Sequence, residues 1–212
     1  MSDPLDLKRF IRTVENFPID GISFRDITSL IETPEAFVKT CDELTKITRE
    51  FGANIIASIE SRGFIFAGTI ARDLSLPFVL ARKPGKLPNK TFKKSFDLEY
   101  GSTSIEIQQN TEIKPGEKIV IVDDLVATGG TAIACAELLT ENFNVRNEDI
   151  LICDTDLITI KIWSEYKYGE CENWIVQRSR HPGFFSCVSG SSRRKFSENL
   201  LQLSVRQAGG TI

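Results

Sequence analysis

Short, mostly apolar runs alternate with longer amphipathic stretches over much of the chain. The apolar runs span 55–59, 77–81, 119–122 and 150–153. Runs of this length, bounded by turn-forming residues, are typical of strands buried on both faces of a parallel sheet. Helical periodicity covers 33–51, 63–74 and 128–139. The alternation predicts an α/β fold with a central, mainly parallel sheet flanked by helices.

Three other segments are assigned from the same pattern. Apolar residues spaced by three and four along 5–14 predict a helix. Residues 18–28, in which Gly21 permits an unusual backbone angle, are predicted to form a structured loop. The polar segment 89–99 is predicted to be a mobile excursion, followed by an alternating strand at 100–107.

Composition and charge restrict the possible functions of the chain. Its 212 residues suit one domain with room for an appendage, and 41% hydrophobic with 26% charged residues is a globular composition. A net charge of −3 argues against nucleic acid as a partner. We expect a cytoplasmic protein without a membrane span or signal peptide, because no apolar run is long enough. The five cysteines lack CxxC pairing, so we expect reduced thiols.

The composition changes near Cys153. The last 59 residues carry eight basic and six acidic residues, both tryptophans and the single histidine. We therefore expect a main domain over 1–153 and an atypical segment, 154–212, that completes or extends it. Carboxylates at Asp154 and Asp156 would be costly inside a buried strand. The segment could be a divergent extension, an alternatively spliced or frame-altered tail, or an added subdomain with an aromatic core.

The most informative stretch is IVIVDDLVATGGT, residues 119–131. A buried strand ends in Asp123 and Asp124, and Gly129 with Gly130 brings bare backbone N–H groups to the start of a helix. Such a helix end is a good phosphate cradle. The carboxylates are too negative to contact the same phosphate, so we expect them to accept hydrogen bonds from sugar hydroxyls. The stretch thus describes a ribose 5-phosphate site; the alternative is a plain strand-turn-helix.

Two further segments offer cations near strand ends. In 60–63, Arg62 presents a fork of donors suited to diphosphate and Gly63 allows close backbone approach. The segment RKPGKLP at 82–88 places three cations in five positions, which could neutralise a leaving diphosphate. The alternatives are a surface arginine in a turn and a solvated basic turn.

Two more segments suit a base and a lid. Residues 96–101 read as a polar lid with an aromatic anchor and a glycine hinge, or as an ordinary surface loop. In 17–28, Phe24 could stack on a flat base, with Arg25 held by Asp26 or offering its main chain to base edges. The alternative is that Phe24 is a core residue.

These five segments, taken in their order along the chain, resemble those of the type I phosphoribosyltransferases, and in particular of their adenine-specific branch. The matching strings are FPIDGISFRDIT, ESRGF, RKPGKLP, LEYG and the stretch 119–131. Asn89 replaces a usual glycine and Ser23 an often hydrophobic residue. The resemblance covers about 5–153 and implies the type I phosphoribosyltransferase fold, with a small N-terminal hood (about 1–30) and a flexible catalytic loop (about 89–107).

The resemblance implies a role for individual residues. Ribose hydroxyls of 5-phosphoribosyl 1-diphosphate (PRPP) are held by Asp123 and Asp124. The 5-phosphate is bound by Ala127, Thr128, Gly129, Gly130 and Thr131. The diphosphate is bound by Glu60, Ser61, Arg62, Gly63, Arg82, Lys83 and Lys86. Adenine is bound by Ser23, Phe24 and Arg25, and the catalytic residues are Glu99, Arg62 and Tyr100.

The implied reaction is adenine plus PRPP giving AMP and diphosphate, a step of purine salvage. The resemblance also implies Mg²⁺ as cofactor, bound mainly through PRPP with no confident direct protein ligand, and a homodimer. The absence of lysine between Thr131 and Ile160 favours adenine over a 6-oxopurine. Two alternatives stay open: a phosphoribosyltransferase for another base, and a non-catalytic nucleotide-binding homologue.

Overall fold

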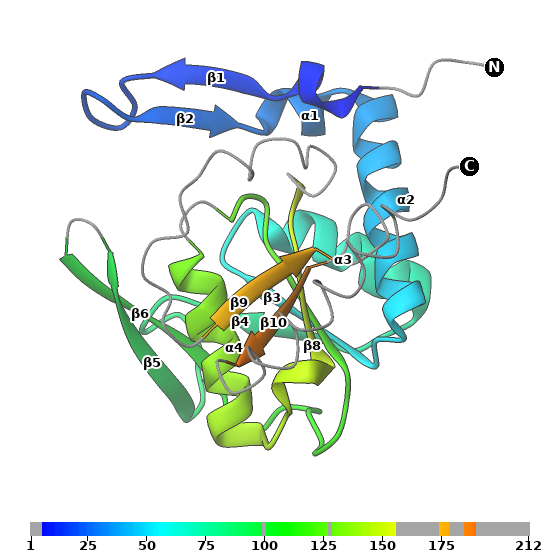
Figure 1. The fold of residues 1–212 in the computed structure, drawn as a ribbon, viewed down its shortest axis with the longest axis vertical. Helices are drawn as coiled ribbons and strands as arrows, with labels where there is room; N and C mark the ends of the chain where they lie inside the picture. The colour runs from blue at the N-terminus through cyan, green and yellow to red at the C-terminus, as the bar shows by residue number, and fades with distance from the viewer. Residues whose placement is uncertain (1–5, 99–100, 127–128, 156–173, 179–184, 190–212) are drawn as a thin grey trace, which may run out of the picture.

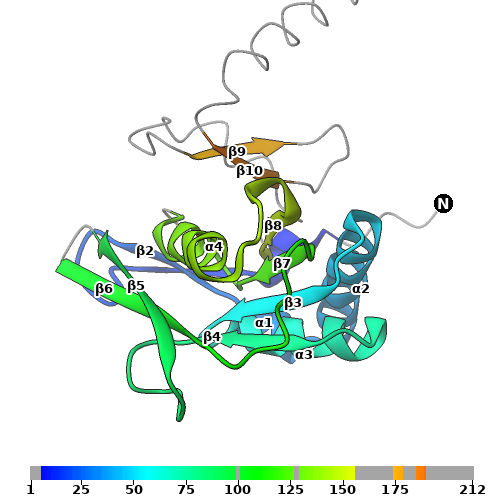
Figure 2. The ribbon, with the colours of Figure 1, turned by 90° about the horizontal axis from the view of Figure 1, so that it is seen from below.

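A six-stranded sheet lies at the centre of the computed structural model, which describes residues 6–98, 101–126, 129–155, 174–178 and 185–189. The strand order is β4-β3-β7-β8-β10-β9, and Figure 1 shows the strands with helices on both sides. The parallel strands are β3 (Ile55–Ile59), β4 (Phe78–Ala81), β7 (Ile119–Val122) and β8 (Ile150–Cys153). The antiparallel continuation is β9 (Trp174–Arg178) and β10 (Phe185–Ser189). Figure 2 shows this pair beyond β8.

All four apolar runs form the predicted parallel strands. Ile55 pairs with Ile119, and Ile119 pairs in turn with Ile150. Every residue of β3, β7 and β8 is buried, as expected for strands covered on both faces. The mainly parallel sheet of an α/β protein is thereby confirmed.

Helices cover the two faces of the sheet. They are α2 (Pro34–Phe51), α3 (Gly63–Leu74) and α4 (Gly130–Phe143), and a short 3₁₀ helix, η2 (Asn147–Asp149), precedes β8. Ile55 and Ile59 of β3 pack in a core shared with α4, whereas Ile56 packs in a second core shared with α2 and α3. Successive strand residues point to opposite faces, so one apolar strand supplies both cores.

The N-terminal part forms a small layer of its own. Its elements are η1 (Leu7–Phe10), β1 (Arg12–Glu15), β2 (Ser23–Asp26) and α1 (Thr28–Glu32). The helix predicted over 5–14 is wrong beyond Phe10, and the loop predicted over 18–28 contains a strand and the start of a helix. The pairing of Val14 with Phe24 decides the conformation, because a hairpin satisfies the backbone of both segments at once.

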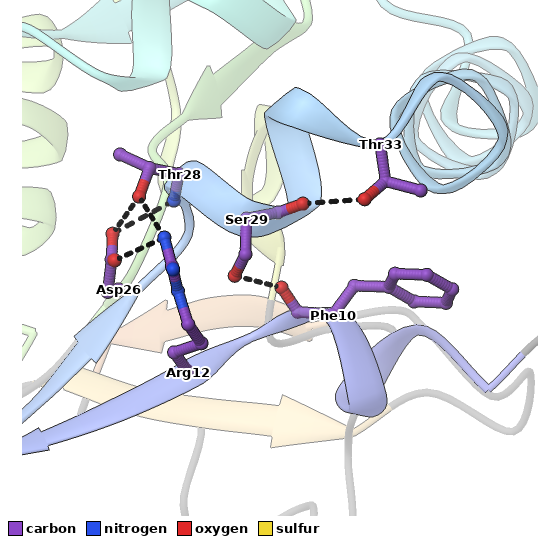
Figure 3. A network of polar contacts seen from close by, with 6 residues as sticks. All are labelled: Phe10, Arg12, Asp26, Thr28, Ser29 and Thr33. Carbon is purple, nitrogen blue, oxygen red and sulfur yellow. Dashed lines mark hydrogen bonds and ion pairs between the residues drawn. The ribbon is translucent and has the colours of Figure 1, made fainter.

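Polar contacts attach this hairpin to α1 (Figure 3). Arg12 forms an ion pair with Asp26 at 3.3 Å and donates to the Thr28 hydroxyl at 3.2 Å. The Ser29 hydroxyl donates to the Phe10 carbonyl at 2.6 Å. The Thr28 N–H also donates to Asp26 of β2 at 2.9 Å, so both strands of the hairpin are bonded to the first residue of α1.

A second hairpin lies against α4. It consists of β5 (Thr91–Leu98) and β6 (Gly101–Gln108). The prediction of an irregular excursion over 89–99 is wrong, because residues 91–98 form a regular strand. The strand predicted over 100–107 is confirmed as β6. Phe92 packs against Phe143 of α4, and Lys94 lies between Glu137 and Glu141 of that helix. An inward-facing lysine with two acidic partners conceals the alternation that would otherwise predict a strand.

No helix in the part of the chain that the structure describes is both long and apolar enough to cross a membrane.

Candidate active site

The predicted site residues gather where the direction of the sheet reverses. From β3 the chain passes through α3 to β4 on one side, and later returns to β7 on the other side of β3. The connections that leave β3 and β7 diverge to opposite faces, since α3 and α4 belong to different cores. Open α/β sheets bind ligands at the carboxyl ends of strands at such a point. Residues 60–63 and 123–124 lie there.

The segment after β3 makes a tight passage into α3. The Glu60–Ser61 peptide bond is cis, and Gly63 begins the helix. A Cβ atom on Gly63 would lie 2.7 Å from the Val122 carbonyl oxygen and 3.0 Å from the Asp123 Cα. Only glycine allows this helix end to approach the end of β7 so closely.

Arg62 joins three parts of the site. Its Nε lies 2.9 Å from Asp124 Oδ2, and its guanidinium carbon is 5.1 Å from the centre of the Phe24 ring. The Asp124 oxygen is buried and, among the described residues, receives no well-aligned hydrogen bond, so the contact is an ion pair. A guanidinium over an aromatic face is also attracted by the ring. One side chain thus touches the hairpin layer and the end of β7 together.

The two aspartates after β7 are buried side by side. The Asp124 N–H donates to Asp123 Oδ1 at 2.9 Å. Burial, the neighbouring charge of Asp124 and, to a smaller extent, that of Asp154 raise the pKa of the Asp123 carboxyl to about 8. Polar ligand groups that donate hydrogen bonds would satisfy these oxygens.

The start of α4 has the expected geometry. Gly129 is in the left-handed region with φ 82°, and its carbonyl accepts the Ile133 N–H at 2.8 Å. Gly130 and Thr131 then form the first turn, where free N–H groups favour an anion. Ala127 and Thr128 lie outside the described residues.

Arg82 is tied to Glu60. Its Nη2 and Nε lie 3.1 and 3.3 Å from the two Glu60 carboxylate oxygens, and the Lys83 N–H donates to Glu60 at 2.9 Å. The hydrogen bond from Arg82 lowers the pKa of Glu60 below its ordinary value. Arg82 also donates to the Lys86 carbonyl at 3.0 Å. Lys83 and Lys86 themselves are exposed at the rim of the site.

The three predicted base-binding residues lie on β2. The Ser23 hydroxyl donates to Glu15 and Arg25 donates to the Thr13 hydroxyl, so both polar side chains bond to β1. Phe24 instead contacts the Phe17 ring, with centroids 5.1 Å apart, and Arg62. The structure therefore brings Phe24, but not the side chains of its neighbours, to Arg62. Glu99 and Tyr100 lie outside the described residues.

Sequence reasoning missed Asp154 and Thr155. The Val126 N–H donates to Asp154 Oδ2 at 2.9 Å, and the Thr155 N–H donates to the Asp124 carbonyl at 3.1 Å. The expected burial cost of Asp154 is offset, because the carboxylate lies just beyond β8 and receives this hydrogen bond. A signal existed: parallel pairing of β7 with β8 places the residues after Cys153 beside those after Val122.

A parallel α/β sheet with an arginine and two aspartates at the ends of β3 and β7 is typical of proteins that bind a sugar phosphate at the switch point of the sheet. Comparison of the sequence with known protein families leads to the same class. The family model described as phosphoribosyl transferase domain matches residues 28–155, so the chain belongs to the phosphoribosyltransferase family.

Within this family, the similarity is to adenine phosphoribosyltransferases. One from Novosphingobium aromaticivorans is 52% identical over 134 residues, which cover 63% of this chain and 75% of the relative. One from Mesoplasma florum is 45% identical over 164 residues, 77% and 96% of the two chains. The crystal structure of the Giardia lamblia enzyme complexed with 9-deazaadenine superposes with a TM-score of 0.66 at 37% identity, covering 70% of this chain and 82% of that one.

Proposed function

We propose that this protein is an adenine phosphoribosyltransferase, which transfers the 5-phosphoribosyl group of PRPP to adenine and releases AMP and diphosphate. The observation that carries the proposal is the meeting of Arg62, Asp124 and Phe24 at the switch point of the sheet. One cation, one ribose-binding carboxylate and one aromatic face suit the diphosphate, the sugar and the base of this reaction. The adenine phosphoribosyltransferase relatives support the choice of base.

The sugar phosphate is assigned to the end of β7 and the start of α4. The 5-phosphate accepts hydrogen bonds from the loop 127–131, where the helix end contributes a partial positive charge. Asp123 and Asp124 accept hydrogen bonds from the ribose hydroxyls. When the bond to diphosphate breaks, the sugar becomes cation-like, and the two carboxylates face the developing positive charge.

The diphosphate is assigned to residues at the ends of β3 and β4. Arg62 is paired with Asp124 and Arg82 with Glu60. These carboxylates hold both guanidinium groups near the place where the leaving group's charge develops. Lys83 and Lys86 add positive charge at the exposed rim. Charge placed in advance requires little rearrangement during the reaction and so lowers its barrier.

The base is assigned to the face of Phe24, with the backbone of Ser23 and Arg25 beside it. Stacking on a ring suits a flat purine. Glu99 and Tyr100, which lie between β5 and β6 in the sequence, complete the proposal as proton-transfer and lid residues. A lid over the site would exclude water and protect PRPP from hydrolysis.

Magnesium is the proposed cofactor, carried by PRPP. The donor set fits this arrangement, because the carboxylates of Asp123 and Asp124 stand at the proposed ribose position. Carboxylate and phosphate oxygens are the ligands that this hard cation prefers. Bound Mg²⁺ would supply charge neutralisation to the diphosphate.

We further propose a cytoplasmic homodimer. Val38 of α2 and Ile65 of α3 are apolar side chains that are 57% and 40% exposed. Two exposed apolar side chains are candidates for a protein contact, and a contact between copies would have to bury them together with their neighbours. Light scattering on the purified full chain measures the mass; a monomer at micromolar concentration would contradict this part of the proposal.

The function is tested by incubating the full-length protein with radiolabelled adenine, PRPP and Mg²⁺ and measuring AMP. Hypoxanthine, guanine and orotate serve as competing bases under identical conditions. We expect AMP formation with adenine, and loss of turnover when EDTA removes Mg²⁺. Release of diphosphate with another base alone would give the chain a different substrate, and no release with any base would refute the enzymatic assignment.

A further inference from the structure

Two residues beyond β8 contact the backbone of residues 119–131, which form the proposed PRPP segment. Asp154 and Thr155 are 4% and 1% exposed. Asp154 Oδ2 accepts the Val126 N–H at 2.9 Å. Thr155 makes two hydrogen bonds to the Asp124 carbonyl, one from its N–H at 3.1 Å and one from its hydroxyl. Residues 154–155 therefore hold the backbone of residues 124–126 at two points, the Asp124 carbonyl and the Val126 N–H.

These contacts fall where the PRPP segment has no helix or strand of its own. β7 ends at Val122 and α4 begins at Gly130; just beyond β7 the Asp123 N–H still donates to the Cys153 carbonyl at 3.0 Å, and the Asp124 carbonyl and the Val126 N–H follow. Buried backbone groups there need partners from elsewhere. The Asp124 carbonyl and the Val126 N–H receive those partners from Thr155 and Asp154, so the path of the chain into the loop is set by residues of the next strand's end.

We propose that Asp154 and Thr155 are positioning residues for PRPP binding: they fix the backbone that presents the ribose-binding carboxylate of Asp124 and begins the 5-phosphate loop. The proposal rests on the proposed function, in that it takes this segment as the PRPP site. Neither residue touches the reacting atoms.

The contact of Asp154 with the Val126 N–H is one of hydrogen-bond acceptance. An ionised carboxylate offers only acceptors, and an asparagine side chain keeps one acceptor oxygen of similar placement. The negative charge of Asp154 also raises the pKa of Asp123, an effect that asparagine would remove. The acceptor function therefore predicts that asparagine can replace this aspartate and alanine cannot.

The experiment compares Asp154→Ala with Asp154→Asn in the full-length enzyme under steady-state conditions. Loss of an acceptor leaves the Val126 N–H without its partner, so we expect Asp154→Ala to raise the KM for PRPP about tenfold. The KM for adenine and kcat should stay within about threefold, because the base site and the reacting groups are untouched. Asp154→Asn should restore the KM for PRPP to within about threefold of the wild type.

A matched control lies at the other end of the same strand. Asp149 precedes β8, is 3% exposed and accepts a hydrogen bond from Arg146 at 2.6 Å. Asp149→Ala should lower the melting temperature without changing the KM for PRPP. An equal rise in that KM would mean that loosening of β8 is the cause, which overturns the proposal.

Two other results would also overturn it: an unchanged KM for PRPP in folded Asp154→Ala, or an Asp154→Asn variant as impaired as the alanine variant. If Asp154→Ala fails to fold, Thr155→Val decides, because it removes one of the two hydrogen bonds to Asp124. We expect a rise of about threefold in the KM for PRPP, and no rise refutes the role.

Failure of the proposed function and failure of the positioning role give different experimental results. Absence of AMP formation by the wild type refutes the proposed function. Calorimetric titration of the same variants with PRPP and Mg²⁺ then tests positioning directly. About tenfold weaker binding by Asp154→Ala supports it, and equal binding by all variants contradicts it.

Discussion

Replacing Gly63 by alanine tests how closely α3 must approach the end of β7. The added Cβ would lie 2.7 Å from the Val122 carbonyl oxygen, roughly 0.7 Å nearer than an ordinary contact. It would also lie 2.8 Å from the Ser58 hydroxyl and 3.0 Å from the Asp123 Cα. Two of these three atoms are backbone, so relief requires movement of β7 or of the helix. Gly63→Ala should therefore both destabilise the protein and displace Asp123.

The expected cost is that of overpacking a buried contact, about 1–3 kcal/mol. In a protein of this size each kcal/mol changes the melting temperature by about 2–4 °C, which predicts a fall of roughly 2–12 °C. Differential scanning calorimetry measures the fall. Steady-state kinetics should show a higher KM for PRPP, because Asp123 belongs to the proposed ribose site.

Gly68 provides the control within the same helix. A Cβ on Gly68 meets nothing within 4 Å. Alanine is favoured over glycine inside a helix by about 0.5–1 kcal/mol, so Gly68→Ala should raise the melting temperature by roughly 2 °C. If both variants melt at the same temperature and bind PRPP equally well, close approach at Gly63 is not a constraint.

Three further predictions follow from the same contacts. Asp124→Ala should lower AMP formation by at least about tenfold while the circular dichroism spectrum stays native; normal turnover would refute the ribose assignment. Because the pKa of Asp123 is raised from 3.8 to about 8, the stabilisation from its bound proton is complete below pH 3.8 and is lost as the pH rises to about 8. Asp123→Asn should thus gain stability over the wild type between pH 5 and pH 8 in urea unfolding, and a constant difference would contradict this. Lys94→Met, which removes the ion pairs to Glu137 and Glu141, should cost about 0.5–1 kcal/mol at low salt and less in about 1 M NaCl; a cost that does not depend on salt would show that packing is lost instead.

The sheet was predictable because its strands are uniform. The runs at 55–59, 119–122 and 150–153 are apolar at almost every position, and burial on both faces leaves little choice of structure. The starts of α2 and α3 were equally clear, since proline and glycine mark them. The hairpins were not predictable from the same rules. Val14 is paired with a residue ten positions later, and Lys94 faces inward only because α4 supplies two acids.

The site was predictable in its members but not in its contacts. Motif spacing placed Arg62, Asp123 and Asp124 at strand ends, as the structure does. Nothing in the spacing says that Arg62 pairs with Asp124 across 62 positions, or that it lies over the Phe24 ring. Asp154 was misjudged because its cost was considered without the Val126 N–H that it accepts. Such partners depend on which strands become neighbours.

The pairing of β3 with β7 has a consequence for synthesis of the protein. Ser58 donates to the Val122 carbonyl across 64 positions, and the intervening chain forms β4 and the second hairpin. Contacts between residues so distant in sequence form late and slow the folding of a chain. On the ribosome, a nascent chain that ends before β7 contains the proposed diphosphate-binding residues 60–63 and 82–86 but lacks the proposed ribose-binding residues 123 and 124. If PRPP binds as proposed, it can stabilise only chains in which α4 has also emerged, and it cannot assist the earlier steps of folding.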